Sequence, residues 1–154
     1  MSTVHFALVN CQCDQLGVSF PNYDTTLGSK LRVHGTEDQV RVFTLNLSSL
    51  PAGVSMTTMQ EVPEEVTWTH FYRVRPSKQL SKLKAGVKSG HITDPKVYRI
   101  KMCEEVLSEP FFITKSSSTK QVYKRFVGKK EASPQASGSF DSFGMSMNAA
   151  VPVF

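Results

Sequence analysis

The sequence lacks the features that would place a chain in a membrane or an export route. No run of about 18 apolar residues occurs in its 154 residues, which argues against a transmembrane helix. The first fifteen residues have no basic segment and only a short apolar stretch, so no signal peptide is expected. Cysteine is scarce and odd in number, at Cys11, Cys13 and Cys103, which predicts reduced thiols. We therefore expect the protein in the nucleus, the cytoplasm or both.

Motifs for catalysis and for metal binding are also missing. The sequence has no G-x-S-x-G, no H-E-x-x-H and no G-x-x-x-x-G-K-[ST]. The carboxylates of Glu64/Glu65 and Glu104/Glu105 are neighbours, and neighbours in a strand point to opposite faces. The cysteines and histidines lack the paired spacing of zinc sites. These absences predict that the chain is not an enzyme and has no catalytic residues, no metal site and no cofactor.

Signals for strands outnumber signals for helices. The clearest strand is Val66 to Val74, in which Trp68 and Tyr72 alternate with Phe71 and Arg73. Further strands are expected in the runs 5–9, 31–34, 40–47, 97–106, 111–114 and 122–127. Turns rich in Pro, Gly and Asn separate the runs. The pattern predicts an all-β fold, an antiparallel β-sandwich or barrel with at most one short helix.

The helix, if one forms, is expected at Ser77 to Lys88, where apolar residues recur at helical spacing. A basic loop remains an equal alternative there. Beyond about residue 130 the composition shifts to Ser, Gly, Ala and Met. We predict a β-rich globular domain over residues 1–130 and a disordered tail over residues 131–154. The tail's phenylalanines are either contacts for a partner or without a role.

The uneven distribution of charge is the most informative feature of the sequence. Residues 1–66 carry three Lys or Arg against seven Asp or Glu, a net charge of −4. Residues 67–130 carry fifteen Lys or Arg against four Asp or Glu, a net charge of +11. A block of this density creates a local positive potential that attracts polyanions.

Two segments of this block are candidates for binding nucleic acid. Residues 73–88 contain no acidic side chain and suit contacts along a phosphate backbone. Residues 115–130 interleave cations with Tyr123 and Phe126, which suits stacking on bases and also matches a nuclear import signal. The alternative is a solvated basic surface without a partner. The predicted nucleic-acid-binding residues are Arg73, Arg75, Lys78, Lys82, Lys84, Lys88, Lys120, Lys124 and Arg125.

Residues Val106 to Arg125 carry a resemblance to a known family. They read VLSEPFFITKSSSTKQVYKR, a Pro-Phe step followed by an aliphatic residue and then by Ser and Lys. This order resembles the closing strand of immunoglobulin-like transcription factor domains of the Rel-homology type. The resemblance implies an immunoglobulin-like sandwich whose last strand runs into a basic segment that meets DNA, and hence a nuclear, DNA-binding role in transcription regulation.

We therefore predict a non-enzymatic basic β-sandwich that binds DNA or RNA, or acts in a nuclear regulatory complex. The alternative is a protein–protein interaction or assembly module, such as an adaptor or a small viral structural or accessory protein. In that case an acidic protein surface or a second copy of the chain would meet the basic half, because the two halves are complementary in charge. No lipidation motif or clear amphipathic helix is present, so no membrane partner is expected.

Overall fold

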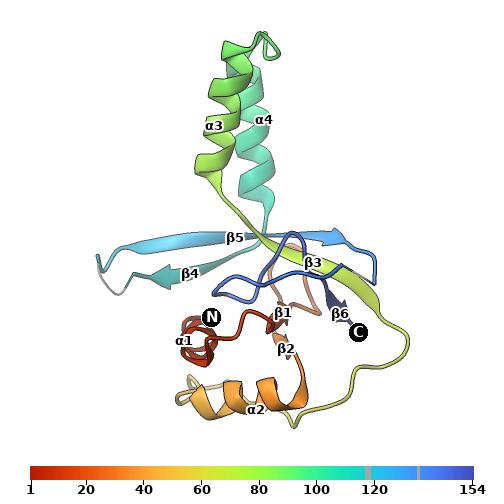
Figure 1. Ribbon diagram of the computed structural model, residues 1–154. Helices are drawn as coiled ribbons and strands as arrows, with labels where there is room; N and C mark the ends of the chain where they lie inside the picture. Colours follow the sequence, from red (N-terminus) through yellow and green to blue (C-terminus); the bar gives the residue numbers. More distant parts are fainter. Residues whose placement is uncertain (117–118, 135) are drawn as a thin grey trace.

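A curled sheet lies at the centre of the molecule, with helices on both of its sides (Figure 1). The structure is a computed structural model that describes residues 1–116, 119–134 and 136–154, and side chains throughout these ranges except at positions 76–80, 101 and 105–107. Two short helices lie on one side of the sheet, and a helical hairpin rises from the other side (Figure 1).

The described part of the chain contains both helices and strands. The helices are α1 (Ser2–Cys11), α2 (Glu37–Asn46), α3 (Pro76–Lys88) and α4 (Pro95–Ser108). The strands are β1 (Gly17–Ser19), β2 (Arg32–His34), β3 (Thr67–Val74), β4 (Phe111–Lys115), β5 (Val122–Glu131) and β6 (Val151–Val153). None of these helices combines the length and the apolar composition that a membrane span requires.

The central sheet has the strand order β4-β5-β3-β6, with every neighbouring pair antiparallel, while β1 and β2 form a separate two-stranded ribbon. Arg73 of β3 lies opposite Val127 of β5, and Arg125 of β5 lies opposite Phe112 of β4. Directly opposed residues share a face, and so do residues two apart in one strand. These four side chains therefore lie on one face of the sheet, the face on which α1 packs (Figure 1).

The expectation of an all-β sandwich or barrel, immunoglobulin-like or otherwise, is wrong. Residues 5–9, expected as a strand, belong to α1. Val4, Ala7, Leu8 and Cys11 of α1 all face the core, at the i, i+3, i+4, i+7 spacing of a helix stripe. The short apolar run was too brief to distinguish this stripe from a strand.

Two further expected strands are also helices, because their start signals outweigh their β-branched composition. Residues 40–47 fall mostly in α2, which begins with a capping box between Thr36 and Gln39. Residues 97–106 fall in α4, which begins at Pro95 with the Asp94 carboxylate accepting two backbone N–H bonds. The open choice for residues 77–88 is settled as helix α3. The strands expected at 31–34, 66–74, 111–114 and 122–127 are confirmed.

The disordered tail of the fold prediction is likewise wrong. Val151 to Val153 form β6, which pairs with the start of β3 and completes the sheet. Phe143, Met145 and Val151 are at most 6% exposed and belong to the same core cluster as Phe71. The segment has little periodicity in its sequence, and it is ordered by what it packs against: an unpaired strand edge and an apolar sheet face.

The helical hairpin of α3 and α4 is anchored where α4 meets β4. The Tyr23 hydroxyl lies 2.8 Å from both Glu109 Oε2 and the carbonyl oxygen of Val127. The Val127 N–H donates to the Pro110 carbonyl at 2.8 Å. Burial, and then Glu109, raises the pKa of the Tyr23 hydroxyl, so it remains a donor at neutral pH. These bonds tie the base of the hairpin to β5.

Gly144 offers a test of order in the C-terminal segment. It has φ +72°, and an added Cβ would lie 2.5 Å from Val18 Cγ2. Gly53 has φ +79° and open space around it, so it is a matched control for backbone strain alone. We expect Gly53→Ala to lower the free energy of unfolding by about 1 kcal/mol and Gly144→Ala by about 2–4 kcal/mol, because overpacking adds to the strain. Equal losses in urea denaturation would contradict the packing of residues 141–151.

His34 predicts how stability depends on pH. Burial, and then the nearby Arg32, lowers the pKa of the His34 imidazole to about 4, and its Nε2 lies 2.7 Å from Ser19 Oγ. The folded state thus holds the neutral ring while the unfolded chain takes up a proton below its ordinary pKa of about 6.5. Stability should therefore fall by about 2 kcal/mol between about pH 7 and pH 5. Urea melts of the wild type and His34→Gln should differ in this slope, and parallel slopes would contradict the assignment.

Candidate functional site

The ring of Phe143 is the centre of a cluster of charged and aromatic side chains. The imidazole of His5 stacks on it, with ring centroids 4.1 Å apart and planes 7° apart. His5 Nδ1 lies 2.6 Å from the carbonyl oxygen of Ser142. A carbonyl only accepts, so Nδ1 carries a proton, and in the neutral ring Nε2 holds the lone pair. The stack and the hydrogen bond fix the direction in which this basic nitrogen points.

The loop that carries Phe143 is shaped by one carboxylate. Asp141 Oδ1 accepts the backbone N–H groups of Phe143 at 2.8 Å and of Met145 at 3.2 Å. Gly144 supplies the positive φ that this tight turn needs. Phe143 then packs against Phe112 of β4, with ring centroids 5.6 Å apart. The turn therefore delivers the aromatic ring to the sheet face where β4 and β5 meet.

Two guanidinium groups approach the same ring from adjacent strands. Arg73 Cζ lies 5.1 Å and Arg125 Cζ lies 5.9 Å from the Phe143 centroid. Arg125 Nε donates to Thr114 Oγ1 at 3.3 Å. Arg73 Nη1 lies 3.7 Å from Asp141 Oδ2. We call His5, Arg73, Arg125, Asp141 and Phe143 the Phe143 cluster.

The Phe143 cluster combines a proton-transfer group with cationic groups. An imidazole that presents an unprotonated nitrogen is suited to general acid–base chemistry near neutral pH. Guanidinium groups beside it are suited to holding an anion and to stabilising negative charge that develops on oxygen. The arrangement therefore fits chemistry at a phosphate group better than simple adhesion to a polyanion.

The predicted binding residues of α3 lie on the projecting hairpin, which we call the basic hairpin (α3 and α4). Lys82, Lys84 and Lys88 are exposed. Lys84 and Lys88 are four residues apart and share one side of the helix, whereas Lys82 is turned to another side. The side chain of Lys78 lies outside the described residues. The cations thus surround the helix instead of forming a single flat face.

The other predicted binding residues are distributed between the two faces of the sheet. Arg73 and Arg125 meet at the Phe143 cluster, whereas Lys124 lies on the opposite face, with Nζ 4.4 Å from the Phe111 ring centroid. Arg75 is exposed at the start of α3, and Lys120 is exposed in the turn between β4 and β5. The predicted binding residues are therefore divided into a recessed arginine pair and exposed cations on other parts of the fold.

Sequence reasoning missed three members of the Phe143 cluster as functional residues: His5, Asp141 and Phe143. His5 was assigned to a strand, and Phe143 to a disordered tail. The Asp-Ser-Phe-Gly order at 141–144 is a turn signal in hindsight, because Asp accepts local N–H bonds and Gly tolerates positive φ. Nothing in the sequence indicates that this turn meets α1, since 137 residues separate His5 from Ser142.

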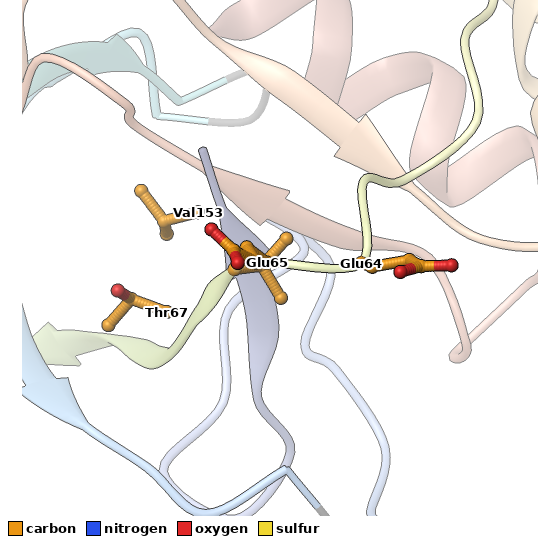
Figure 2. A pocket seen from close by; sticks show the side chains of 5 residues that line it. Glu64, Glu65, Thr67 and Val153 are labelled. Carbon is orange, nitrogen blue, oxygen red and sulfur yellow. The ribbon is translucent and has the colours of Figure 1, made fainter.

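An open hollow of about 450 Å³ lies elsewhere, at the start of β3 beside β6. It is lined by Glu64, Glu65, Val66, Thr67 and Val153, and Figure 2 shows the two carboxylates directed apart. Its negative charge makes it unsuited to a phosphate. Among the described residues no group of three or more His, Cys, Asp or Glu is placed to hold a metal ion.

Comparison with known proteins gives one family and several relatives. A family model described as CRISPR-associated protein (Cas_Csy4) matches residues 1–154. The chain is 28% identical over 147 residues to the CRISPR-associated endonuclease Cas6/Csy4 of Escherichia coli (strain UTI89 / UPEC), covering 90% of this chain and 79% of that protein. It is 28% identical over 161 residues to the protein of the same name from Pseudomonas aeruginosa (strain UCBPP-PA14), covering 98% and 86%.

These matches overturn three expectations and leave a fourth unsupported. The resemblance to Rel-homology domains is wrong, because the family match spans the whole chain while the resemblance spans only Val106 to Arg125. The predicted role in transcription regulation through DNA binding, and the adaptor or viral alternative, are wrong for the same reason. The prediction of a non-enzyme is wrong, because the relatives are named endonucleases. A nuclear location is unsupported, because both relatives are bacterial, while a cytoplasmic one is compatible.

Proposed function

The chain belongs to the Cas_Csy4 family of CRISPR-associated proteins, and from that premise we propose that it is an endonuclease that cuts CRISPR RNA at the Phe143 cluster. The observation that carries the proposal is the stack of His5 on Phe143 beside Arg73 and Arg125. The endonuclease names of the relatives support the reaction class. The charge distribution predicts a nucleic acid as the binding partner, and the proposed function specifies that this nucleic acid is RNA.

The chemistry of RNA suits the groups in the cluster. Each ribose carries a 2′-hydroxyl next to the phosphate that links it to the following nucleotide. His5 Nε2 takes the proton of that hydroxyl, whose oxygen attacks the phosphorus while the bond to the 5′-oxygen of the next nucleotide breaks. The departing 5′-oxygen takes up a proton from water, and the imidazolium of His5 returns its proton to the solvent. The products are a cyclic phosphate on the 2′- and 3′-oxygens and a free 5′-hydroxyl. The fixed Nδ1–H bond to Ser142 keeps the imidazole in the tautomer that this step requires.

The basic hairpin supplies the affinity for the same substrate. Its helices pack on each other and project from the sheet (Figure 1). Lys82 on one side of α3, and Lys84 and Lys88 on another, contact phosphates on two strands of an RNA duplex, and each contact releases counterions. Recognition through phosphates and shape is the usual mode for double-stranded RNA. Binding and cutting are thus assigned to different parts of the fold.

The role of His5 is tested by His5→Phe, which keeps an aromatic stack on Phe143 and removes the basic nitrogen. We expect the single-turnover rate of RNA cleavage to fall by about 10²–10⁴-fold, while the affinity for RNA stays within about twofold. The control is His91→Gln, because His91 is exposed on the connection between α3 and α4. An RNA with a 2′-deoxy sugar at the cut bond lacks the attacking hydroxyl. It should bind to the wild-type protein but should not be cleaved by it. Cleavage by His5→Phe at the wild-type rate would refute the assignment.

The role of the basic hairpin is tested by the triple variant Lys82→Gln, Lys84→Gln, Lys88→Gln. We expect the slope of log affinity against log salt to decrease by about two to three, with weaker binding of every RNA duplex tested. Cleavage at saturating RNA should be preserved, because the cluster is untouched. Lys30→Gln removes one exposed lysine from the acidic half and should leave the slope nearly unchanged. An unaltered slope in the triple variant would exclude the hairpin as the phosphate-binding element.

A further inference from the structure

One edge of strand β4 is not paired with any strand of the described residues. The strand stands at the end of the sheet order β4-β5-β3-β6, so its pairing with β5 uses only the other edge. Together with the start of β5 it extends as a two-stranded arm, away from the base of the hairpin (Figure 1). An unpaired edge presents backbone N–H and C=O groups to which a further strand can bind. We call this edge the β4 edge.

The hydrogen-bond register shows which residues direct their backbone groups to the β4 edge. The N–H groups of Val127 and Ser116 donate to the carbonyl oxygens of Pro110 and Gln121, at 2.8 and 2.9 Å. In an antiparallel pair such bonds recur at every second residue, and the residues between them direct their groups the other way. Among the described residues, no backbone bond of a turn or loop uses the outward groups. These groups belong to Phe111, Ile113 and Lys115.

The side chains of the same three residues lie on the sheet face opposite the Phe143 cluster, because β4 alternates between exposed and buried side chains. On this face Phe111 is 41% exposed and Ile113 is 59% exposed. Val122 of β5, directly opposite Lys115, is 64% exposed. Large apolar side chains that are exposed together often mark a binding surface for another protein. The β4 edge therefore offers side-chain contacts beside its free backbone groups.

Lysine side chains lie at both ends of this apolar surface. Lys115 is exposed at the end of β4. Lys124 Nζ lies 4.4 Å from the centroid of the Phe111 ring, at the start of β4. The ion pairs found among the described residues include neither lysine. The β4 edge thus presents an apolar centre at Ile113 between two positive ends, and a complementary ligand carries negative charge at both of its ends.

We propose that the β4 edge binds an extended segment of a partner protein by strand addition, with an apolar side chain against Ile113 and an acidic side chain on either side of it. Another peptide backbone matches the outward N–H and C=O groups together, whereas a phosphate accepts hydrogen bonds and donates none. A second copy of β4 would bring lysines of the same sign together, which is unfavourable. Binding here leaves the Phe143 cluster, on the other sheet face, open to substrate.

The experiment measures fluorescence anisotropy of a labelled peptide, Thr-Glu-Thr-Val-Thr-Glu-Thr with blocked ends, titrated with the full chain. We expect it to bind about tenfold more tightly than the same peptide with Lys in place of Glu. The variant Lys115→Glu should reduce this preference by weakening the acidic peptide and strengthening the basic one. Lys30→Glu, at an exposed lysine far along the chain, is the matched control and should keep the preference. Equal affinities for the two peptides would overturn the proposal.

Strand addition is distinguished from simple charge attraction by Ile113→Pro. Proline removes one outward N–H and leaves the bonds to β5 intact, and an edge strand tolerates it at such a position. We expect the acidic peptide to bind this variant at least about tenfold more weakly, while urea melts show that the fold is kept. Unchanged peptide affinity would overturn the proposal. Displacement of the peptide by duplex RNA, or a dimer in light scattering that Ile113→Pro abolishes, would overturn it by giving the β4 edge to RNA or to a second copy.

Discussion

Phe143 is 6% exposed, and its ring contacts His5 from α1, Phe112 from β4 and the guanidinium groups of two strands. Burying an aromatic side chain contributes about 1.5–3 kcal/mol. The C-terminal segment, the first helix and the sheet thus share one contact, and the candidate site exists only when all three are folded. Stability and the geometry of the site are therefore linked through one side chain.

The sequence allowed the sheet to be predicted better than the helices or the site. Val66 to Val74 alternates over nine residues, and its two faces differ clearly, so β3 was predictable. The runs at 5–9 and 40–47 are short and rich in apolar or β-branched residues, which also suits a strand. The stripe of Val4, Ala7, Leu8 and Cys11 and the cap at Thr36 nevertheless decide for helix. Order beyond residue 130 was not predictable, because it depends on a strand edge distant in sequence. The meeting of His5 with Phe143 is a tertiary contact that no local pattern encodes.

Charge was the most useful sequence feature, and it indicated the right class of partner for an incomplete reason. The excess cations of residues 67–130 are one block in the sequence, but the fold separates them. Exposed lysines on the basic hairpin are strongly hydrated point charges suited to binding along a phosphate backbone, whereas Arg73 and Arg125 are recessed, forked donors. A count of cations cannot distinguish these two uses. The register of β3 against β5 can, because it decides which cations share a face.

The hydrogen bonds of the Tyr23 hydroxyl with Glu109 and Val127 hold the base of the hairpin at one place on the sheet. Helix α3 has 13 residues and α4 has 14, so the hairpin extends roughly 20 Å from the sheet. With its base held to β5, the hairpin projects from a fixed place on the sheet. Under the proposed function, this fixed reach sets the distance between the part of an RNA that the hairpin grips and the bond that is cut.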